Sequence, residues 1–393
     1  MMTGDSSIDI SADALNALLD EHVSPQRGDI GDTATASAIQ LAVGTVDEEL
    51  YSGSFGVADP EAPNPQPVTA RTPFDIASIT KSLVGATLAM QAVDERRIDW
   101  YTPIDEVLPA WNRHRAHSAP VPTLLQLLNH TSGLPDWHPF FEDHPVDPTP
   151  RGAIDALNAV VDHIASMELA GPPGTTHTYS DPGYILLTRI LEELFDAGLA
   201  DLARRRIFTP LRLHNTGYAG TRRDPSPVDG AVVTEDCPHR QRVIRGTVHD
   251  TNTNVIGGVS THAGVFSTAT DLLRFGRHLL RIDADRSTDV PRLVSRPTLQ
   301  FAWSDAAGST VGHHLAGWDT PSGERSSAGR GFGPETTVGH LGFTGTSLWI
   351  ERQRGIISVL LTNRVYPSRG NDTIRDLRIA FQETIIPPTR HES

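Results

Sequence analysis

A serine and a lysine three residues apart are the strongest candidates for chemistry in this sequence. Ser78 and Lys81 stand in the stretch Ile-Ala-Ser-Ile-Thr-Lys, and residues three apart on a helix are neighbours. A serine hydroxyl becomes a useful nucleophile when a nearby group takes its proton. Lys81 is the only lysine in 393 residues; the other 32 of the 33 basic residues are arginines, which cannot act as bases. Because a Ser-x-x-Lys pattern also arises by chance, the interpretation depends on further residues.

Two more short motifs carry groups that fit the same chemistry. Tyr179-Ser180-Asp181 stands just before an apolar helical segment, where a tyrosine can present its oxygen to a cleft and share a base role with a lysine. His340-Leu341-Gly342 lies on an expected strand, and Gly342 lets a ligand approach the backbone closely. Taken alone, each motif is more often structural: a packed tyrosine followed by an Asx turn, or a half-buried strand histidine.

The three motifs, in this order along the chain, resemble those of the penicillin-recognising serine hydrolases. The set Ser78-x-x-Lys81, Tyr179-x-Asp181 and His340-x-Gly342 is similar to the class C β-lactamase-like branch, which includes the family VIII carboxylesterases. The resemblance covers roughly residues 35–385. It extends to Asn129-His-Thr-Ser-Gly-Leu-Pro and to the glycine-rich segments 257–272 and 339–350.

This resemblance implies a two-step acyl transfer. Ser78 would attack a carbonyl carbon while Lys81 and Tyr179 share its proton, and water would later release the acyl group by the reverse route. The residues alone leave open which of Lys81 and Tyr179 is the base, since coupled groups titrate together. The backbone N–H groups of Ser78 and Phe343 would form an oxyanion hole. The resemblance implies no metal and no organic cofactor.

Departures from the family pattern point to the substrate class. The lactamases typically carry Lys-Thr-Gly where this chain has His340-Leu341-Gly342, and asparagine where it has Asp181. These changes weaken the binding of an anionic β-lactam or D-Ala-D-Ala-like peptide, because the histidine is mostly neutral, the leucine forms no hydrogen bond and the carboxylate only accepts hydrogen bonds. The binding of a neutral ester is weakened much less. We therefore expect a carboxylesterase for short acyl chains, and Asp181, His340, Leu341 and Gly342 to line its substrate site.

Two other functions remain as alternatives to the esterase. One is a β-lactamase or a D-amino-acid peptidase or amidase, which the altered third motif disfavours. The other is a sensor or binding protein that is acylated on Ser78 without turnover, although such proteins usually also have a membrane segment or a signalling domain. A protein that keeps only the scaffold is the least expected, because the sole lysine stands at the catalytic position.

The sequence patterns of the helices and strands that position these residues predict an α+β fold of the broader α/β class. Short alternating runs at 38–46 and 49–57 indicate a hairpin, and 337–351 and 355–363 indicate two strands near the other end. Helical patterns occupy 9–28, the stretch after Ser78, 124–128, 184–195, 271–282 and 372–385. Strands at both ends predict an antiparallel sheet flanked by helices. We expect one two-lobed domain, with residues 1–100 and 253–393 in one lobe and a mainly helical lobe inserted at 101–252.

Composition excludes several classes of partner. A formal net charge of -15 and a pI near 5.5 argue against a nucleic-acid partner, which leaves a small molecule as the expected one. The longest apolar stretch is far too short for a membrane span. The single cysteine, Cys237, excludes an internal disulfide, and the start of the chain has no secretory signal, so a cytoplasmic location is expected.

The 17 histidines show no pattern of metal ligands in the sequence. There is no His-Glu-x-x-His, and no Cys/His grouping has zinc spacing. We therefore expect no metal site and treat the histidines outside the third motif as structural or surface residues. Adjacent residues on an extended segment face opposite sides, so His313 and His314 are expected to point apart.

Overall fold

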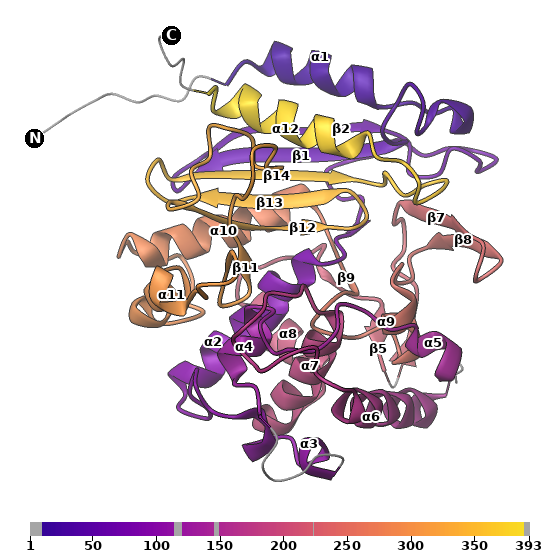
Figure 1. The fold of residues 1–393 in the computed structure, drawn as a ribbon. Helices are drawn as coiled ribbons and strands as arrows, with labels where there is room; N and C mark the ends of the chain where they lie inside the picture. The colour runs from indigo at the N-terminus through magenta and orange to yellow at the C-terminus, as the bar shows by residue number, and fades with distance from the viewer. Residues whose placement is uncertain (1–9, 114–119, 145–148, 223, 389–393) are drawn as a thin grey trace, which may run out of the picture.

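The largest element of the fold is an antiparallel sheet that joins the two ends of the chain (Figure 1). The computed structural model describes residues 10–113, 120–144, 149–222 and 224–388. In spatial order the sheet contains β10 (His314–Leu315), β11 (Trp318–Asp319), β12 (Thr337–Gly342), β13 (Thr346–Glu351), β14 (Ile356–Thr362), β1 (Ala38–Thr45) and β2 (Glu49–Gly56). All neighbouring strands are antiparallel. The predicted sheet built from N- and C-terminal segments is confirmed.

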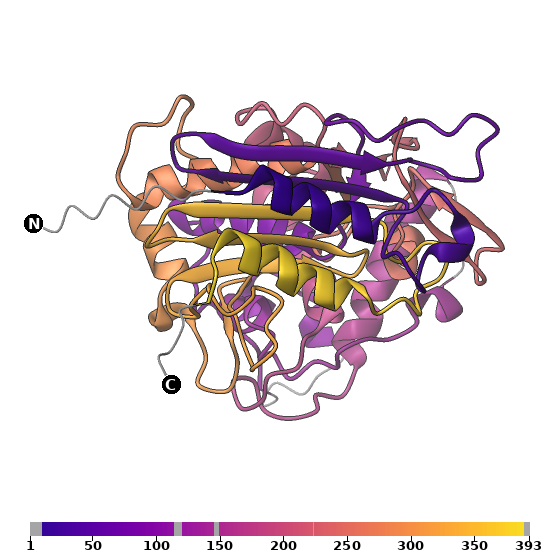
Figure 2. The same cartoon turned by 90° about the horizontal axis from the view of Figure 1, so that it is seen from above.

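Helices cover both faces of this sheet. α1 (Ala12–His22) and α12 (Ile374–Ile385) lie side by side on the outer face, as the view from above shows (Figure 2). α10 (Ala269–Asp283) lies against the inner face (Figure 1). Because both faces are covered, every residue of β14 is buried, which explains why this strand is apolar throughout and does not alternate.

The remaining helices lie mainly on the inner side of the sheet (Figure 1). They are α2 (Thr87–Asp94), α3 (Ala110–Arg113), α4 (Leu124–Leu128), α5 (Phe140–Asp143), α6 (Pro150–Ser166), α7 (Asp181–Phe195), α8 (Leu199–Ala203), α9 (Thr251–Val255) and α11 (Arg296–Ala302). A second apolar core between α3, α6 and α7 includes Trp111, Val160 and Ile190. The lobe boundaries at 101 and 252 stay a prediction.

Two boundaries differ from those expected from the sequence. The stretch 337–351, interpreted as one strand, is a hairpin of β12 and β13 that turns at 343–345. Gly345 at this turn has a φ of +100°, which glycine adopts at little cost. The helix that follows Ser78 starts with a π-helical stretch, η2 (Lys81–Ala86), before α2 continues it. Both features lie beside the candidate site.

Short strands add structure that the sequence patterns do not predict. A small sheet is formed by β3 (Phe74–Asp75), β9 (Val265–Ser267) and β4 (Gly217–Tyr218), and its strand β3 stands just before Ser78 in the chain. Two further hairpins pair β5 (Gly220–Thr221) with β6 (Asp224–Pro225) and β7 (Val233–Cys237) with β8 (Arg242–Arg245).

The helices of the described part of the chain are all too short or too polar to cross a membrane. The first nine residues, where the sequence shows no secretory signal, lie outside the described residues. The cytoplasmic location stays a prediction.

Candidate active site

A tight turn presents Ser78 at the end of the small sheet. Ala77 has a φ of +46°, an uncommon conformation for a residue with a side chain, and such strain is typically found at functional sites. The buried carboxylate of Asp75 stabilises the turn by accepting a hydrogen bond from the Ala77 N–H at 2.9 Å and another from the His249 N–H at 2.7 Å. Ser78 is therefore fixed before the helix begins.

Lys81 lies next to Ser78, as their spacing predicts. The fully buried Nζ donates to Ser78 Oγ at 3.0 Å, to Asp181 Oδ1 at 2.7 Å and to the backbone carbonyl of His262 at 3.2 Å. These three acceptors use all three N–H groups of an ammonium. The buried ammonium of Lys81 thus has both an ion-pair partner and full hydrogen bonding, which offset the free-energy cost of removing its charge from water.

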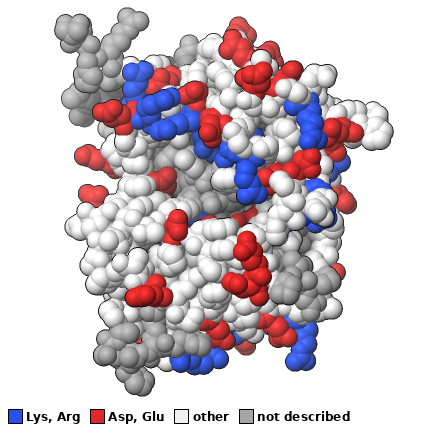
Figure 3. All heavy atoms as spheres, turned by 45° about the vertical axis from the view of Figure 1, so that its right-hand side comes forward, with Lys and Arg blue, Asp and Glu red and all other residues white. Residues whose placement is uncertain are grey.

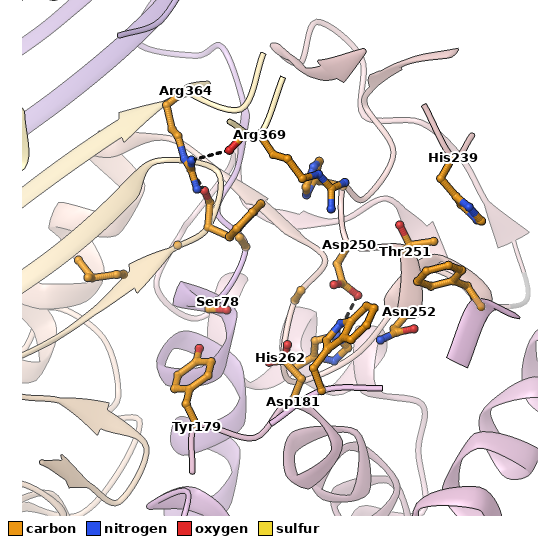
Figure 4. A pocket seen from close by; sticks show the side chains of 18 of the residues that line it. Ser78, Tyr179, Asp181, His239, Asp250, Thr251, Asn252, His262, Arg364 and Arg369 are labelled. Carbon is orange, nitrogen blue, oxygen red and sulfur yellow. Dashed lines mark hydrogen bonds and ion pairs between the residues drawn. The ribbon is translucent and has the colours of Figure 1, made fainter. Parts of the chain in front are cut away.

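Tyr179 completes a cluster around Ser78. Lys81 Nζ lies 4.8 Å from the centre of the Tyr179 ring, and the tyrosine points its hydroxyl toward Ser78 (Figure 4). Ser180, the next residue, caps α7 by accepting a hydrogen bond from the Gly183 N–H, and this cap fixes the loop that carries Tyr179. The two sequence motifs are thus brought together although 100 residues separate Lys81 from Asp181.

The charges around Lys81 decide its protonation state. Burial by itself lowers the pKa of Lys81, but Asp181 and Tyr179 outweigh it, so the pKa is raised. Loss of water raises the pKa of Tyr179, although Lys81 opposes this change. In the resting protein Lys81 is therefore an ammonium and Tyr179 a neutral phenol. As the predicted base, the pair would accept the Ser78 proton only after it had released one of its own.

Replacing Asp181 with asparagine should lower the pKa of Lys81, because it removes the strongest influence that raises this pKa while burial remains. Since Lys81 is the sole lysine, ¹³C-lysine labelling gives one side-chain NMR signal whose shift reports its titration directly. A base works only when neutral, so the rise of kcat/KM with pH should move to lower pH in parallel. Asp201→Asn, an exposed matched control, should leave the titration unchanged. An unchanged or higher pKa in Asp181→Asn would contradict this account.

The second predicted oxyanion donor lies on the β12–β13 hairpin. Neither the Ser78 nor the Phe343 N–H donates a hydrogen bond to any described residue, and both residues line the same cavity. Thr344 Oγ1 donates to the Asp75 carbonyl at 2.7 Å and Thr346 Oγ1 to the Ile76 carbonyl at 3.1 Å. These bonds hold the hairpin against the segment that carries Ser78.

Two arginines hold the same hairpin from its other side. Arg378 Nη2 donates to the carbonyls of Gly342 and Thr346, at 2.8 and 2.7 Å. Arg364 Nε donates to the carbonyl of Phe343 at 2.9 Å. No sequence pattern pointed to these arginines, which come from α12 and from the end of β14. For Arg364, the only available signal in the sequence is the run Thr-Asn-Arg that follows the buried strand.

Gly342 is explained by packing. A Cβ at this position would lie 2.4 Å from the Ile76 carbonyl oxygen and 2.0 Å from Thr346 Oγ1. Glycine therefore lets the strand end pack directly against the nucleophile segment, whereas the sequence suggested close approach of a ligand.

The groups around Ser78 open into a cavity of about 770 Å³. Of the predicted site residues, Ser78, Tyr179, Asp181, Leu341, Gly342 and Phe343 line it. Trp137, Phe141, His239, His249, Asp250, Asn252, His262, Arg364, Arg369 and Arg378 also line it and were missed from the sequence. Figure 3 shows this face hollowed between the sheet and the helices, with basic side chains gathered above the hollow.

His340 lies outside the cavity lining. Its ring is buried, with Nδ1 2.8 Å from the carbonyl oxygen of Leu341, which fixes the proton on Nδ1. Desolvation and the nearby Lys81 lower the pKa of His340 to about 3, so the ring is neutral. Its centre is 6.2 Å from that of Tyr179. A direct contact between His340 and substrate stays a prediction.

Another part of the cavity wall is formed by a buried histidine, His262, and a partly exposed aspartate, Asp250. His262 Nε2 lies 2.9 Å from Asp250 Oδ1 (Figure 4). His262 Nδ1 lies 2.7 Å from Ser260 Oγ. Burial raises the pKa of Asp250, but His262 and Thr253 outweigh it and lower this pKa below its usual range. Since the carbonyl of His262 accepts a hydrogen bond from Lys81 Nζ, the His262–Asp250 pair also helps to hold Lys81 in place.

Comparisons with known proteins agree with this geometry. The family model described as Beta-lactamase matches residues 26–381. An N-acetylmuramyl-L-alanine amidase of Bacillus subtilis is 28% identical over 323 residues, which cover 76% of this chain and 70% of the relative. Penicillin-binding protein 4 of Amycolatopsis lactamdurans is 28% identical over 358 residues, which cover 82% of this chain and 81% of the relative.

Solved structures share the fold. EstCE1, described as a hydrolase with promiscuous acyltransferase activity, superposes with a TM-score of 0.68 at 19% identity and covers 94% of this chain and 97% of its own. A penicillin-binding protein homologue from Caulobacter crescentus superposes with a TM-score of 0.65 at 17% identity, and the match covers 96% of this chain and 100% of that chain. With the family model matched over most of its length, the chain belongs to the β-lactamase family of penicillin-recognising serine hydrolases.

Proposed function

We propose that this serine hydrolase cleaves short-chain carboxylic esters, as the family VIII carboxylesterases do. The observation that carries the proposal is the contact of Ser78 with the sole lysine, beside Tyr179, in a cavity where Leu341 replaces the hydroxyl residue of the lactamases. His340, buried and neutral, offers no charge for a β-lactam carboxylate. A neutral acyl ester needs neither of the missing groups.

The proposed reaction has two steps. Ser78 Oγ attacks the ester carbonyl carbon, and the Lys81–Tyr179 pair takes the hydroxyl proton while the N–H groups of Ser78 and Phe343 stabilise the oxyanion. The C–O bond to the alcohol then breaks, and the pair returns the proton to the departing oxygen. Water attacks the acyl-enzyme by the same route and regenerates Ser78 with release of the acid.

A second candidate is an amidase or peptidase acting on a substrate with a carboxylate. Arg364 and Arg378 line the cavity, are only 8% and 9% exposed, and have no carboxylate partner among the described residues. Burial and the neighbouring Arg364 lower the pKa of Arg378 to about 9. A bound anion would compensate these charges. Arg369 differs, because its guanidinium already pairs with Glu235 at 2.8 Å.

Hydrolysis of p-nitrophenyl butyrate and of nitrocefin, measured side by side, tests the proposal. We expect kcat/KM for the ester to exceed that for nitrocefin by orders of magnitude, because nitrocefin carries a carboxylate that the third motif no longer binds. Efficient nitrocefin turnover would favour the second candidate. Intact-protein mass spectrometry completes the test: a stable adduct on Ser78 without turnover of either compound would identify an acylated sensor and contradict the esterase.

A further inference from the structure

Three histidines from two distant segments meet beside the active site. His177 precedes α7, and His313 and His314 stand at the start of β10. One ring nitrogen of each lies within 4.8 Å of those of the other two, and His177 Nε2 lies 3.0 Å from His314 Nδ1. The expectation that His313 and His314 point apart is wrong, since their ring centres are 4.7 Å apart.

The chain is shaped to allow this meeting. Gly312 packs against the ring of His177, and a Cβ there would lie 2.4 Å from His177 Cδ2. The backbone N–H of Ala316 donates to Asn129 Oδ1 at 2.7 Å, which holds the segment in place. The three rings are therefore positioned by packing from both sides.

The ligand atoms in this cluster suit a metal ion. Neutral imidazole nitrogens are the commonest metal ligands in proteins, and each of these three histidines contributes one such nitrogen to the group. Asp319 Oδ1 lies 3.4 Å from His313 Nε2 and is buried without a hydrogen-bond partner among the described residues. A carboxylate beside a ligating histidine is the usual outer partner in zinc sites.

We propose that His177, His313 and His314 bind a divalent transition-metal ion, with Zn²⁺ as the best fit. Imidazole nitrogens suit zinc at about 2.0–2.1 Å, and two such ligands of a tetrahedral ion lie roughly 3.3 Å apart, close to the His177–His314 spacing. Three protein ligands leave one position for water. The His313 side chain is 41% exposed, so the ion can enter from solvent.

A bound ion would link two segments that matter for catalysis. His177 is two residues before Tyr179, and the ring centre of His314 lies 5.9 Å from that of Tyr179. An ion that joins His177 to His313 and His314 would therefore fasten the Tyr179 loop to β10. This role requires binding alone and does not depend on which substrate the enzyme hydrolyses.

Titration of chelator-treated, dialysed protein with ZnCl₂ in a calorimeter tests the site. We expect one ion per chain, and replacement with Co²⁺ should give the intense visible absorption of a tetrahedral site. His313→Ala and His177→Ala should each weaken binding by at least the roughly 10- to 100-fold that loss of an outer partner costs. Asp319→Asn should weaken it within that range. Bound Zn²⁺ should also raise the melting temperature of the wild type and not of His313→Ala.

A second group on the chain supplies the matched control. His138, Asp143 and His163 also bring ligand atoms together, but Asp143 Oδ2 already pairs with His138 Nε2 at 2.7 Å. His163→Ala should therefore leave Zn²⁺ affinity unchanged. The proposal is overturned if the protein binds no Zn²⁺, or if His163→Ala removes binding while His313→Ala keeps it. Circular dichroism of each variant separates loss of ligand from loss of fold.

Discussion

Replacing Ser78 with alanine should lower kcat/KM for p-nitrophenyl butyrate by about 10⁴- to 10⁶-fold, the effect of removing the nucleophile from a serine hydrolase. The Tyr179 hydroxyl also interacts with Lys81, but burial raises the pKa of this phenol, which makes it a poor replacement for Ser78 as nucleophile. The variant should still fold, since Ser78 Oγ interacts with the polar groups of Lys81 and Tyr179 at the wall of the cavity and not with the apolar core. Initial rates, together with the absence of an acyl adduct in mass spectra, provide the measurement.

Ser82→Ala is the matched control for this variant. Ser82 lies on the helix that follows Ser78, is fully buried, and donates a hydrogen bond to the Gly317 carbonyl at 2.8 Å. Its loss should cost about 1–3 kcal/mol of stability, because a buried acceptor loses its partner, and leave the rate nearly unchanged. Equal losses of activity in the two variants would contradict a special role for Ser78.

Much of the architecture could be predicted because it depends on local patterns. The strands β1 and β14 are marked by continuous apolar runs, and the helices α1, α10 and α12 by their amphipathic periodicity. Ser78 and Lys81 meet because residues three apart on a helical turn are neighbours. The split of 337–351 into two strands was missed, because a turn inside an apolar run is signalled only by Gly342 and Gly345.

The rest of the site depends on contacts between distant segments. Arg378 reaches the Gly342 carbonyl across 36 residues, Thr344 reaches Asp75 across 269, and His177 reaches His314 across 137. No periodicity records such contacts. The resemblance placed Tyr179 and Asp181 at the same site as Lys81, but it gave no sign that Asp181 would bind Lys81 directly. His340 also illustrates the limit, since strand alternation did not reveal that its ring is buried.

Replacing Lys81 with arginine should lower kcat/KM for the ester by about 10²- to 10⁴-fold, the usual contribution of a general base. The positive charge and the ion pair with Asp181 remain possible, so any loss reports proton transfer more than charge. Because arginine stays protonated above pH 12, activity should not recover as pH rises, whereas wild-type activity should rise with pH as the Lys81–Tyr179 pair loses a proton.

The pH profile makes the Lys81→Arg result decisive. Arg325→Lys, an exposed exchange of the opposite sense, is the control and should leave both rate and profile unchanged. If Lys81→Arg retained most of the activity and still showed a rise with pH, the titrating base would be Tyr179, with the cation serving only to stabilise its phenolate. A flat, low profile would instead mean that the proton of Ser78 must pass through the lysine amine, and that the chain keeps its one lysine for this purpose.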